Sequence, residues 1–394
     1  MKRALILIAL ILTTLSVATL LDHLPKDYDS ALYVPDLSKA YNAIKGTTIG
    51  SALLDMLGLE SMADNFIASQ LQAYDVDPEE FYSSLKELLV LSKDQDILVA
   101  VGPSKNPDKI KSAIEDISGA TGTVNVVDDY LVFSTSQSLL DGFKTGGGEL
   151  PVKEYLEDEK TLAVSYSRNP DAVVSGRAWF ENGMLKSQSR TRALDQEGRE
   201  VIESLRPKKT FENSDLIEGD AFVMVNTGNI EKIIEYMKDY GVKFTEIDEN
   251  QLKKLGNEML FCIEYSKAAV DMFQGSEEST ELKLKGYVET STTLQEIAQK
   301  NESCNLEGNE LVCDDIHIAA SGGKLWFYMP GKDVKLSGKA KEAFKDLYTG
   351  NEIVLVFADF SRILSEVFGL NEDSHLIITV WVEKDEIVSR LEIK

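Results

Sequence analysis

The stretch GDAFVMVNTGNIEKIIEYM, residues 219–237, contains the local signals on which the fold of this 394-residue chain depends. A polar turn leads into the apolar run 222–225, and Asn229 then precedes residues with helical apolar spacing. Asparagine is a favoured N-cap, because its side chain accepts a hydrogen bond from a backbone N–H that the first helical turn leaves without a partner. The stretch therefore predicts a buried strand followed by a capped amphipathic helix.

The same pattern occurs twice more in the chain. Near the N-terminus the apolar run 31–34 leads through Asp36 into a helical run, and near the C-terminus the run 353–357 leads through Asp359 into another. Weaker copies predict strands at residues 97–101, 130–133 and 162–166. Repetition of one strand–cap–helix unit predicts duplicated modules.

Turn signals decide between a parallel and an antiparallel arrangement. Asn182-Gly183 is a strong two-residue hairpin turn, and residues 281–290 alternate apolar and charged side chains. Hairpins join antiparallel neighbours, so we expect α+β modules with antiparallel or mixed sheets rather than a parallel βαβ array. The polar stretch 206–215 predicts a boundary between a first module, residues 22–207, and a related second module, residues 215–394.

The N-terminus has the pattern of an export signal. Met1-Lys2-Arg3 precedes an uncharged apolar run, residues 4–21, which as a helix would measure about 27 Å against a hydrocarbon core of about 30 Å. Ser16-Val17-Ala18 is a fair cleavage site, so residues 1–21 are either a cleaved signal peptide or a retained membrane anchor. We expect the body to be extracytoplasmic and to meet the membrane only through residues 4–21.

The charge balance limits the partners. Lys and Arg number 41 against 66 Asp and Glu, for a net charge of −25, which repels nucleic acid. Residues 177–209, in contrast, contain more basic than acidic residues. This window is either a docking face for an anionic glycan or partner, or a solvated strand face. The basic residues of this window are Arg177, Lys186, Arg190, Arg192, Arg199, Arg206, Lys208 and Lys209.

The stretch CNLEGNELVC, residues 304–313, predicts a disulfide. With Gly308-Asn309 at a hairpin tip, Cys304 and Cys313 form a non-hydrogen-bonded pair with Cα atoms about 4.5 Å apart, a distance that a disulfide tolerates. An oxidising compartment favours the bond. The alternative is a metal pair with His317 as a third ligand, whereas Cys262 is expected to be a buried thiol.

Four stretches resemble a known family in order and spacing. They are LPKDYDSALYVPDLSKAYNAI (24–44), YDVDPEEFYSSL (74–85), DDYLVFSTSQSLLDGF (128–143) and FENGML (180–185). Together they resemble the bacterial extracytoplasmic family called domain of unknown function 3352. The resemblance implies an envelope location and a duplicated α+β fold, and it provides no catalytic residues.

Few residues suggest a catalytic or metal-binding site. The chain has three histidines, His23, His317 and His375, and none stands near a nucleophile motif such as GxSxG. The acidic cluster 75–80 resembles a calcium or catalytic site, but Asp77 followed by Pro78 is better read as a helix cap.

The sequence therefore predicts a non-catalytic cell-envelope protein that binds or scaffolds an unknown envelope protein or polymer, with no catalytic, cofactor or metal-binding residues. The alternative is an enzyme acting on envelope polymers, such as a carboxylate-dependent glycoside hydrolase. That enzyme would need two facing acids, with Trp179, Trp326 or Trp381 as a sugar platform.

Overall fold

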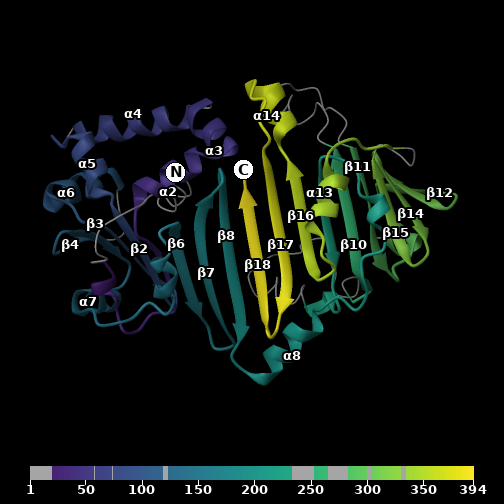
Figure 1. Ribbon diagram of the computed structural model, residues 1–394, viewed down its shortest axis with the longest axis horizontal. Helices are drawn as coiled ribbons and strands as arrows, with labels where there is room; N and C mark the ends of the chain where they lie inside the picture. Colours follow the sequence, from purple (N-terminus) through teal and green to yellow (C-terminus); the bar gives the residue numbers. More distant parts are fainter. Residues whose placement is uncertain are drawn as a thin grey trace. The chain divides into compact units, whose positions relative to one another are not determined.

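The chain forms two compact units that divide between Leu194 and Asp195, called unit 1 and unit 2 below (Figure 1). The computed structural model describes residues 20–56, 58–72, 74–118, 123–232, 253–264, 283–299, 303–329 and 334–394. The polar stretch 206–215, expected to be the boundary, lies within unit 2.

Unit 1 is built on an antiparallel sheet. Its described strands are β1 (Ser30–Val34), β2 (Glu87–Lys93), β3 (Asp96–Gly102), β4 (Thr123–Val127), β5 (Tyr130–Ser134), β6 (Thr161–Arg168), β7 (Ala172–Glu181) and β8 (Met184–Ala193). Their spatial order is β4-β5-β3-β2-β1-β6-β7-β8, so β1 lies inside the sheet with β2 on one edge and β6 on the other. Asn182 and Gly183 turn β7 into β8 with φ values of 54° and 76°, as the predicted hairpin requires.

Helices cover both faces of this sheet. The helical segments of unit 1 are η1 (Leu20–His23), α2 (Leu37–Lys45), α3 (Thr48–Ser51), η2 (Ala52–Met56), α4 (Leu59–Gln72), α5 (Pro78–Ser84), α6 (Pro107–Ser118), α7 (Gln137–Thr145) and η3 (Lys153–Glu157). On one face, η1 and α7 pack on a core that includes Tyr33, Leu89 and Leu91. On the other face, α2 packs on Leu88, while α4 and α6 pack on Leu131.

Unit 2 is also built on an antiparallel sheet. Its described strands are β9 (Ala221–Asn226), β10 (Leu255–Glu264), β11 (Lys283–Thr290), β12 (Cys304–Glu307), β13 (Glu310–Cys313), β14 (Ile316–Ser321), β15 (Lys324–Met329), β16 (Glu352–Asp359), β17 (His375–Glu383) and β18 (Glu386–Ile393). Their order is β12-β13-β14-β15-β11-β10-β9-β16-β17-β18. The helical segments in its described part are α8 (Gln196–Ser204), η4 (Ser214–Leu216), α12 (Leu294–Ala298), α13 (Ala340–Leu347) and α14 (Ser361–Phe368).

The order of strands in the two units corresponds. β9 lies between β10 and β16 as β1 lies between β2 and β6, and the β14–β15 hairpin takes the place of β4–β5. Among the described residues, the β12–β13 hairpin and α14 are additions of unit 2. The prediction of an α+β fold with antiparallel sheets is confirmed, while a common origin of the two units stays a prediction.

Three of the four expected helix caps are confirmed. The side chain of Asp36 accepts a hydrogen bond from the Lys39 N–H at 2.9 Å, that of Asp77 from Glu79, and that of Asn229 from Lys232. The prediction for Asp359 was wrong by one residue: Phe360 is the N-cap of α14, and Asp359 ends β16. Its carboxylate accepts a hydrogen bond from the N–H of Ser361, the first residue of α14.

The predicted apolar segment lies mostly outside the described residues. Residues 1–19 are not described, and its last two residues, Leu20 and Leu21, open η1. Leu20 is fully buried in the core of unit 1. Within the described part of the chain, no helix is both long and apolar enough to cross a bilayer.

The predicted disulfide is present between Cys304 and Cys313. The register is the one expected, with Leu306 opposite Leu311, and Gly308 has the positive φ, 66°, that the first central residue of a type II′ turn adopts. Cys262 is a buried free thiol on β10, and burial raises its pKa to about 11. It is therefore a poor nucleophile at neutral pH.

We expect the native protein, denatured without reductant, to show one free thiol, and three after reduction. The double variant Cys304→Ser/Cys313→Ser should lose about 2–3 kcal/mol of stability, since the bond closes only a short loop. Thiol titration and urea unfolding measure both; three free thiols before reduction, in protein from its native compartment, would contradict the assignment.

Candidate functional site

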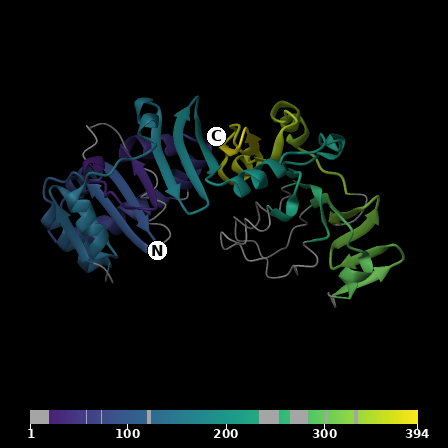
Figure 2. The ribbon, with the colours of Figure 1, turned by 90° about the horizontal axis from the view of Figure 1, so that it is seen from below.

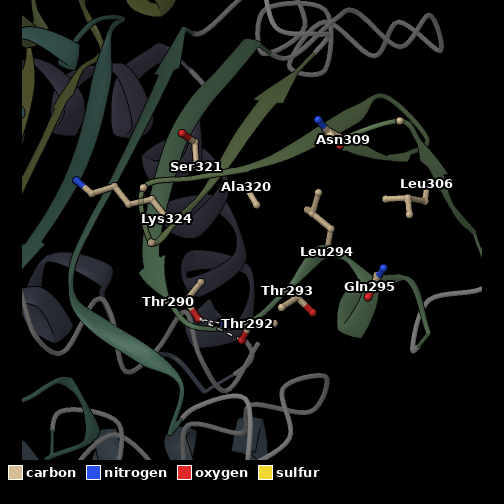
Figure 3. Close-up of a pocket in the computed structure, with 13 residues that line it drawn as sticks. Thr290, Thr292, Thr293, Leu294, Gln295, Leu306, Asn309, Ala320, Ser321 and Lys324 are labelled. Carbon is tan, nitrogen blue, oxygen red and sulfur yellow. Dashed lines mark hydrogen bonds between the residues drawn. The ribbon is translucent and has the colours of Figure 1, made fainter.

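A groove lies in unit 2 where three connections meet: the β11–α12 connection, the tip of the β12–β13 hairpin, and the β14–β15 turn (Figure 3). Its volume is about 470 Å³. Figure 2 shows the strands β12 to β15 with α12 gathered at one end of unit 2. The groove is thus built on the hairpin that unit 2 adds.

Turn and cap chemistry fixes the walls of the groove. Thr293 caps α12 through a reciprocal capping box with Glu296. The Thr290 hydroxyl donates to the Lys254 carbonyl at 3.0 Å, and the Thr290 N–H donates to the Gly323 carbonyl at 2.9 Å. Gly322 and Gly323 both have positive φ values, 62° and 72°, which side-chain-bearing residues rarely adopt, so the turn is bare of side chains.

The groove offers uncharged groups to a ligand. The side chains of Gln295, Asn309 and Ser321 line it and make no hydrogen bond to other described residues. Leu294 lies among the labelled residues between the threonines and the hairpin residue Leu306, which is 47% exposed (Figure 3). A ligand would therefore meet amides, a hydroxyl, bare turn backbone and two leucines.

Lys324, the basic residue in the described lining, directs its charged amine away from the groove. Figure 3 shows the Lys324 amine directed away from the other lining residues. Lys324 Nζ lies 2.8 Å from Glu258 Oε1 and 3.9 Å from the centre of the Tyr287 ring. The stem of Lys324 thus lines the groove, while its charge is neutralised inside the unit.

Glu258 is the centre of a buried polar network. Its side chain is about 1% exposed and accepts hydrogen bonds from the Tyr287 hydroxyl at 2.6 Å and the Asn213 amide at 2.7 Å, besides that from Lys324. Lys209 Nζ lies 3.8 Å away. Burial alone would raise the pKa of Glu258, but the hydrogen bonds from Lys324 and Tyr287 outweigh it and hold the pKa below its ordinary value.

The pKa of Tyr287 is shifted in the opposite direction, upward. Burial, and then its hydrogen bond to the Glu258 carboxylate, raise its pKa far above the ordinary value. Tyr287 is consequently a donor at any physiological pH, and the network is a closed ionic cluster.

Unit 1 has a buried glutamate in the corresponding place. Val34 pairs with Leu88 as Val225 pairs with Met259, so the preceding residues, Glu87 and Glu258, hold matching positions. Glu87 is also fully buried; its carboxylate accepts from the Tyr33 hydroxyl at 3.0 Å and the Leu20 N–H at 3.3 Å. Sequence reasoning missed both glutamates, because a glutamate in a strand is usually solvated. Their correspondence appears only in the strand pairing, since Glu87 and Glu258 stand at different sequence distances from the repeated strand.

The three histidines lie apart from one another. In unit 1, His23 stacks on Phe143 and faces Asp128 at 3.4 Å. His317 pairs with Glu310 at 3.2 Å and His375 stacks on Phe357. On the two sides of His317, Ile318 is buried and Ile316 is 38% exposed.

Residues of the acidic cluster 75–80 and of the basic window 177–209 contact neighbouring groups of the protein. In the acidic cluster 75–80, Asp77 is the predicted cap and Pro78 opens α5. The basic window 177–209 is divided between the units. Within it, Arg177 pairs with Asp158 at 3.0 Å, and Arg206 donates to the Val382 carbonyl. Among the described residues, no three His, Cys, Asp or Glu side chains gather as metal ligands.

The tryptophans do not line the groove. Trp179 is 7% exposed and lies under the Arg177 guanidinium. Trp326 packs on Tyr287 with ring centres 5.0 Å apart. Trp381 is half-buried on β17, opposite Val388.

Comparison with protein families, with curated proteins and with solved structures found no match. The resemblance to domain of unknown function 3352 therefore stays a prediction.

We expect Glu258→Gln to lower the free energy of unfolding by about 3 kcal/mol at pH 7, because removing one partner of a buried ion pair leaves the other charge uncompensated. Glu307→Gln, at an exposed position of β12, is the matched control and should change stability by less than about 0.5 kcal/mol. Urea unfolding measures both; equal stabilities of the two variants would contradict the role of the network.

The effect of Glu258→Gln should also depend on pH. The pKa of Glu258 is lower in the folded than in the unfolded chain, so its stabilisation is complete above the unfolded carboxyl pKa of about 4.3 and is lost as the pH falls through the folded value. The stability difference between wild type and variant should therefore shrink below about pH 4. A difference that grows on acidification would argue against a charged Glu258.

Proposed function

We propose that the chain is a non-catalytic binding protein of the cell envelope, and that the groove of unit 2 holds an uncharged, extended polymer segment. The observation that carries the proposal is the lining itself. Amide and hydroxyl groups that have no partner among the described residues, those of Gln295, Asn309 and Ser321, surround two partly exposed leucines. Such a mixture suits a ligand with its own hydrogen-bonding groups and small apolar substituents.

The lining favours binding over catalysis. Glycoside hydrolysis needs two carboxyl groups about 5–9.5 Å apart across the substrate. Among the residues that the structure describes, those that line the groove include no carboxylate, imidazole or thiol. Glu258, the acid that Lys324 contacts behind the wall, is buried and bound to its own partners, so its charge serves stability.

An extended peptide fits the lining better than a sugar chain. Sugar sites commonly place an aromatic face against the ring, and the described part of the lining has no aromatic side chain. The turn at Gly322 and Gly323 carries no side chains, so that another main chain could approach it closely. Leu294 and Leu306 would then contact the peptide's side chains.

Photo-crosslinking in intact cells tests the groove. A photoreactive residue at Gln295 should give a defined adduct, whereas one at Lys345, an exposed position of α13, should not. Ser321→Trp fills the groove and should lower the Gln295 adduct at least tenfold without changing the melting temperature; Lys345→Trp is its control. Equal adducts at both positions, or an undiminished adduct in the filled groove, would refute the proposal.

The compartment is a separate part of the proposal. The basic start, the apolar residues 4–21 and the disulfide are together compatible with export to an oxidising compartment. We expect a reporter enzyme that works only outside the cytoplasm to be active when fused after Lys394. Activity of a cytoplasm-only reporter at the same position would exclude export.

A further inference from the structure

Most of the large exposed apolar side chains described in unit 1 lie on one group of helices. Leu53 on η2, Leu59, Met62 and Phe66 on α4, and Tyr82 on α5 are between 39% and 66% exposed. These five residues are called the helical apolar surface below. Figure 1 shows α4 running along unit 1 from α3 toward α5.

The surface has the form of one helix face. Leu59, Met62 and Phe66 are spaced three and four residues apart, so they form a single stripe about two turns long on α4. The opposite side of α4 is fixed: Leu71 is 1% exposed in the core shared with α6, and Ile67 packs against that core. The stripe is therefore a second apolar face, which the packing of unit 1 does not use.

The charge around the surface is mostly negative. Residues 46–85 contain seven carboxylates, Asp55, Glu60, Asp64, Asp75, Asp77, Glu79 and Glu80, and no Lys, Arg or His. From neighbouring helices, Lys45 pairs with Glu60 at 2.6 Å and Lys109 lies 3.9 Å from Asp75. These two cations balance only part of the negative charge.

We propose that the helical apolar surface binds a basic amphipathic helix of another protein. An apolar stripe that includes a methionine and lies among carboxylates is complementary to a helix with leucine-type residues on one face and Lys or Arg beside them. The same charge opposes an anionic lipid surface and a second copy of this chain, since both bring more negative charge. The surface lies in unit 1 and is independent of the groove of unit 2.

The connection that carries this surface is an elaboration of the shared fold. In unit 1 the chain between β1 and β2 runs from residue 35 to 86, whereas in unit 2 the chain between β9 and β10 runs only from 227 to 254. The longer connection of unit 1 holds α3, η2, α4 and α5. A partner surface on it would belong to unit 1 alone.

Binding of a model peptide tests the proposal with the full chain. The probe is a fluorescent helical peptide of leucine and lysine with one apolar face, and the control probe has glutamate in place of lysine. We expect the basic peptide to bind and the acidic one not to bind, by fluorescence anisotropy. Binding should weaken at least tenfold when salt rises from about 50 to about 500 mM, because charge attraction is screened.

Variants separate this surface from the overall negative charge. Met62→Gln/Phe66→Gln should weaken binding of the basic peptide at least tenfold, while Ile97→Gln, at a similarly exposed apolar residue of β3, should change it less than twofold. Both variants should keep the wild-type melting temperature, since the side chains replaced are exposed. Equal binding by wild type and the double variant would overturn the proposal. A dimer, or binding to phosphatidylcholine vesicles, that the double variant abolishes would overturn it in favour of those occupants.

Discussion

Both units depend on one constraint, which is that a strand inside a sheet must have hydrogen-bonding neighbours on both edges. β1 and β9 are the strands under this constraint. The next strand in the chain satisfies one edge, and a strand from much later, β6 or β16, satisfies the other. Once these three strands are paired, the remaining strands can add outward by antiparallel pairing, and both faces of the sheet are ready for helices.

The buried glutamates show how matching frameworks allow different chemistry. Glu87 and Glu258 occupy corresponding positions, and each accepts a hydrogen bond from a core tyrosine. The tyrosines come from different strands, since Tyr33 lies on β1 and Tyr287 on β11. Unit 2 adds Lys324, which joins its network to the groove wall. A framework position can thus keep its polar residue while its partners change.

Much of the fold could be predicted from local signals. Strands at residues 31–34 and 222–225 and the Cys304–Cys313 pair follow from apolar runs, caps and turn residues, which act within a few positions. The groove could not be predicted, because its walls come from turns near residues 292, 308 and 322 that meet only through strand pairing. Nor does the spacing of α4 tell which of two apolar faces is buried: Met62 and Ile67 look alike in sequence, and only the position of α6 decides.

During synthesis, β6 and β16 are made long after the strands that they pair with, β1 and β9. The edge of β1 that β6 covers stays open until residue 168 is available, and that of β9 until residue 359. An apolar strand with an open edge can pair with the wrong strand or with another molecule. Contacts this distant in sequence also form slowly, whereas the ten-residue hairpin closed by the disulfide can form at once. Each unit should therefore collapse in a single late step, and a holding chaperone would be most useful just before it.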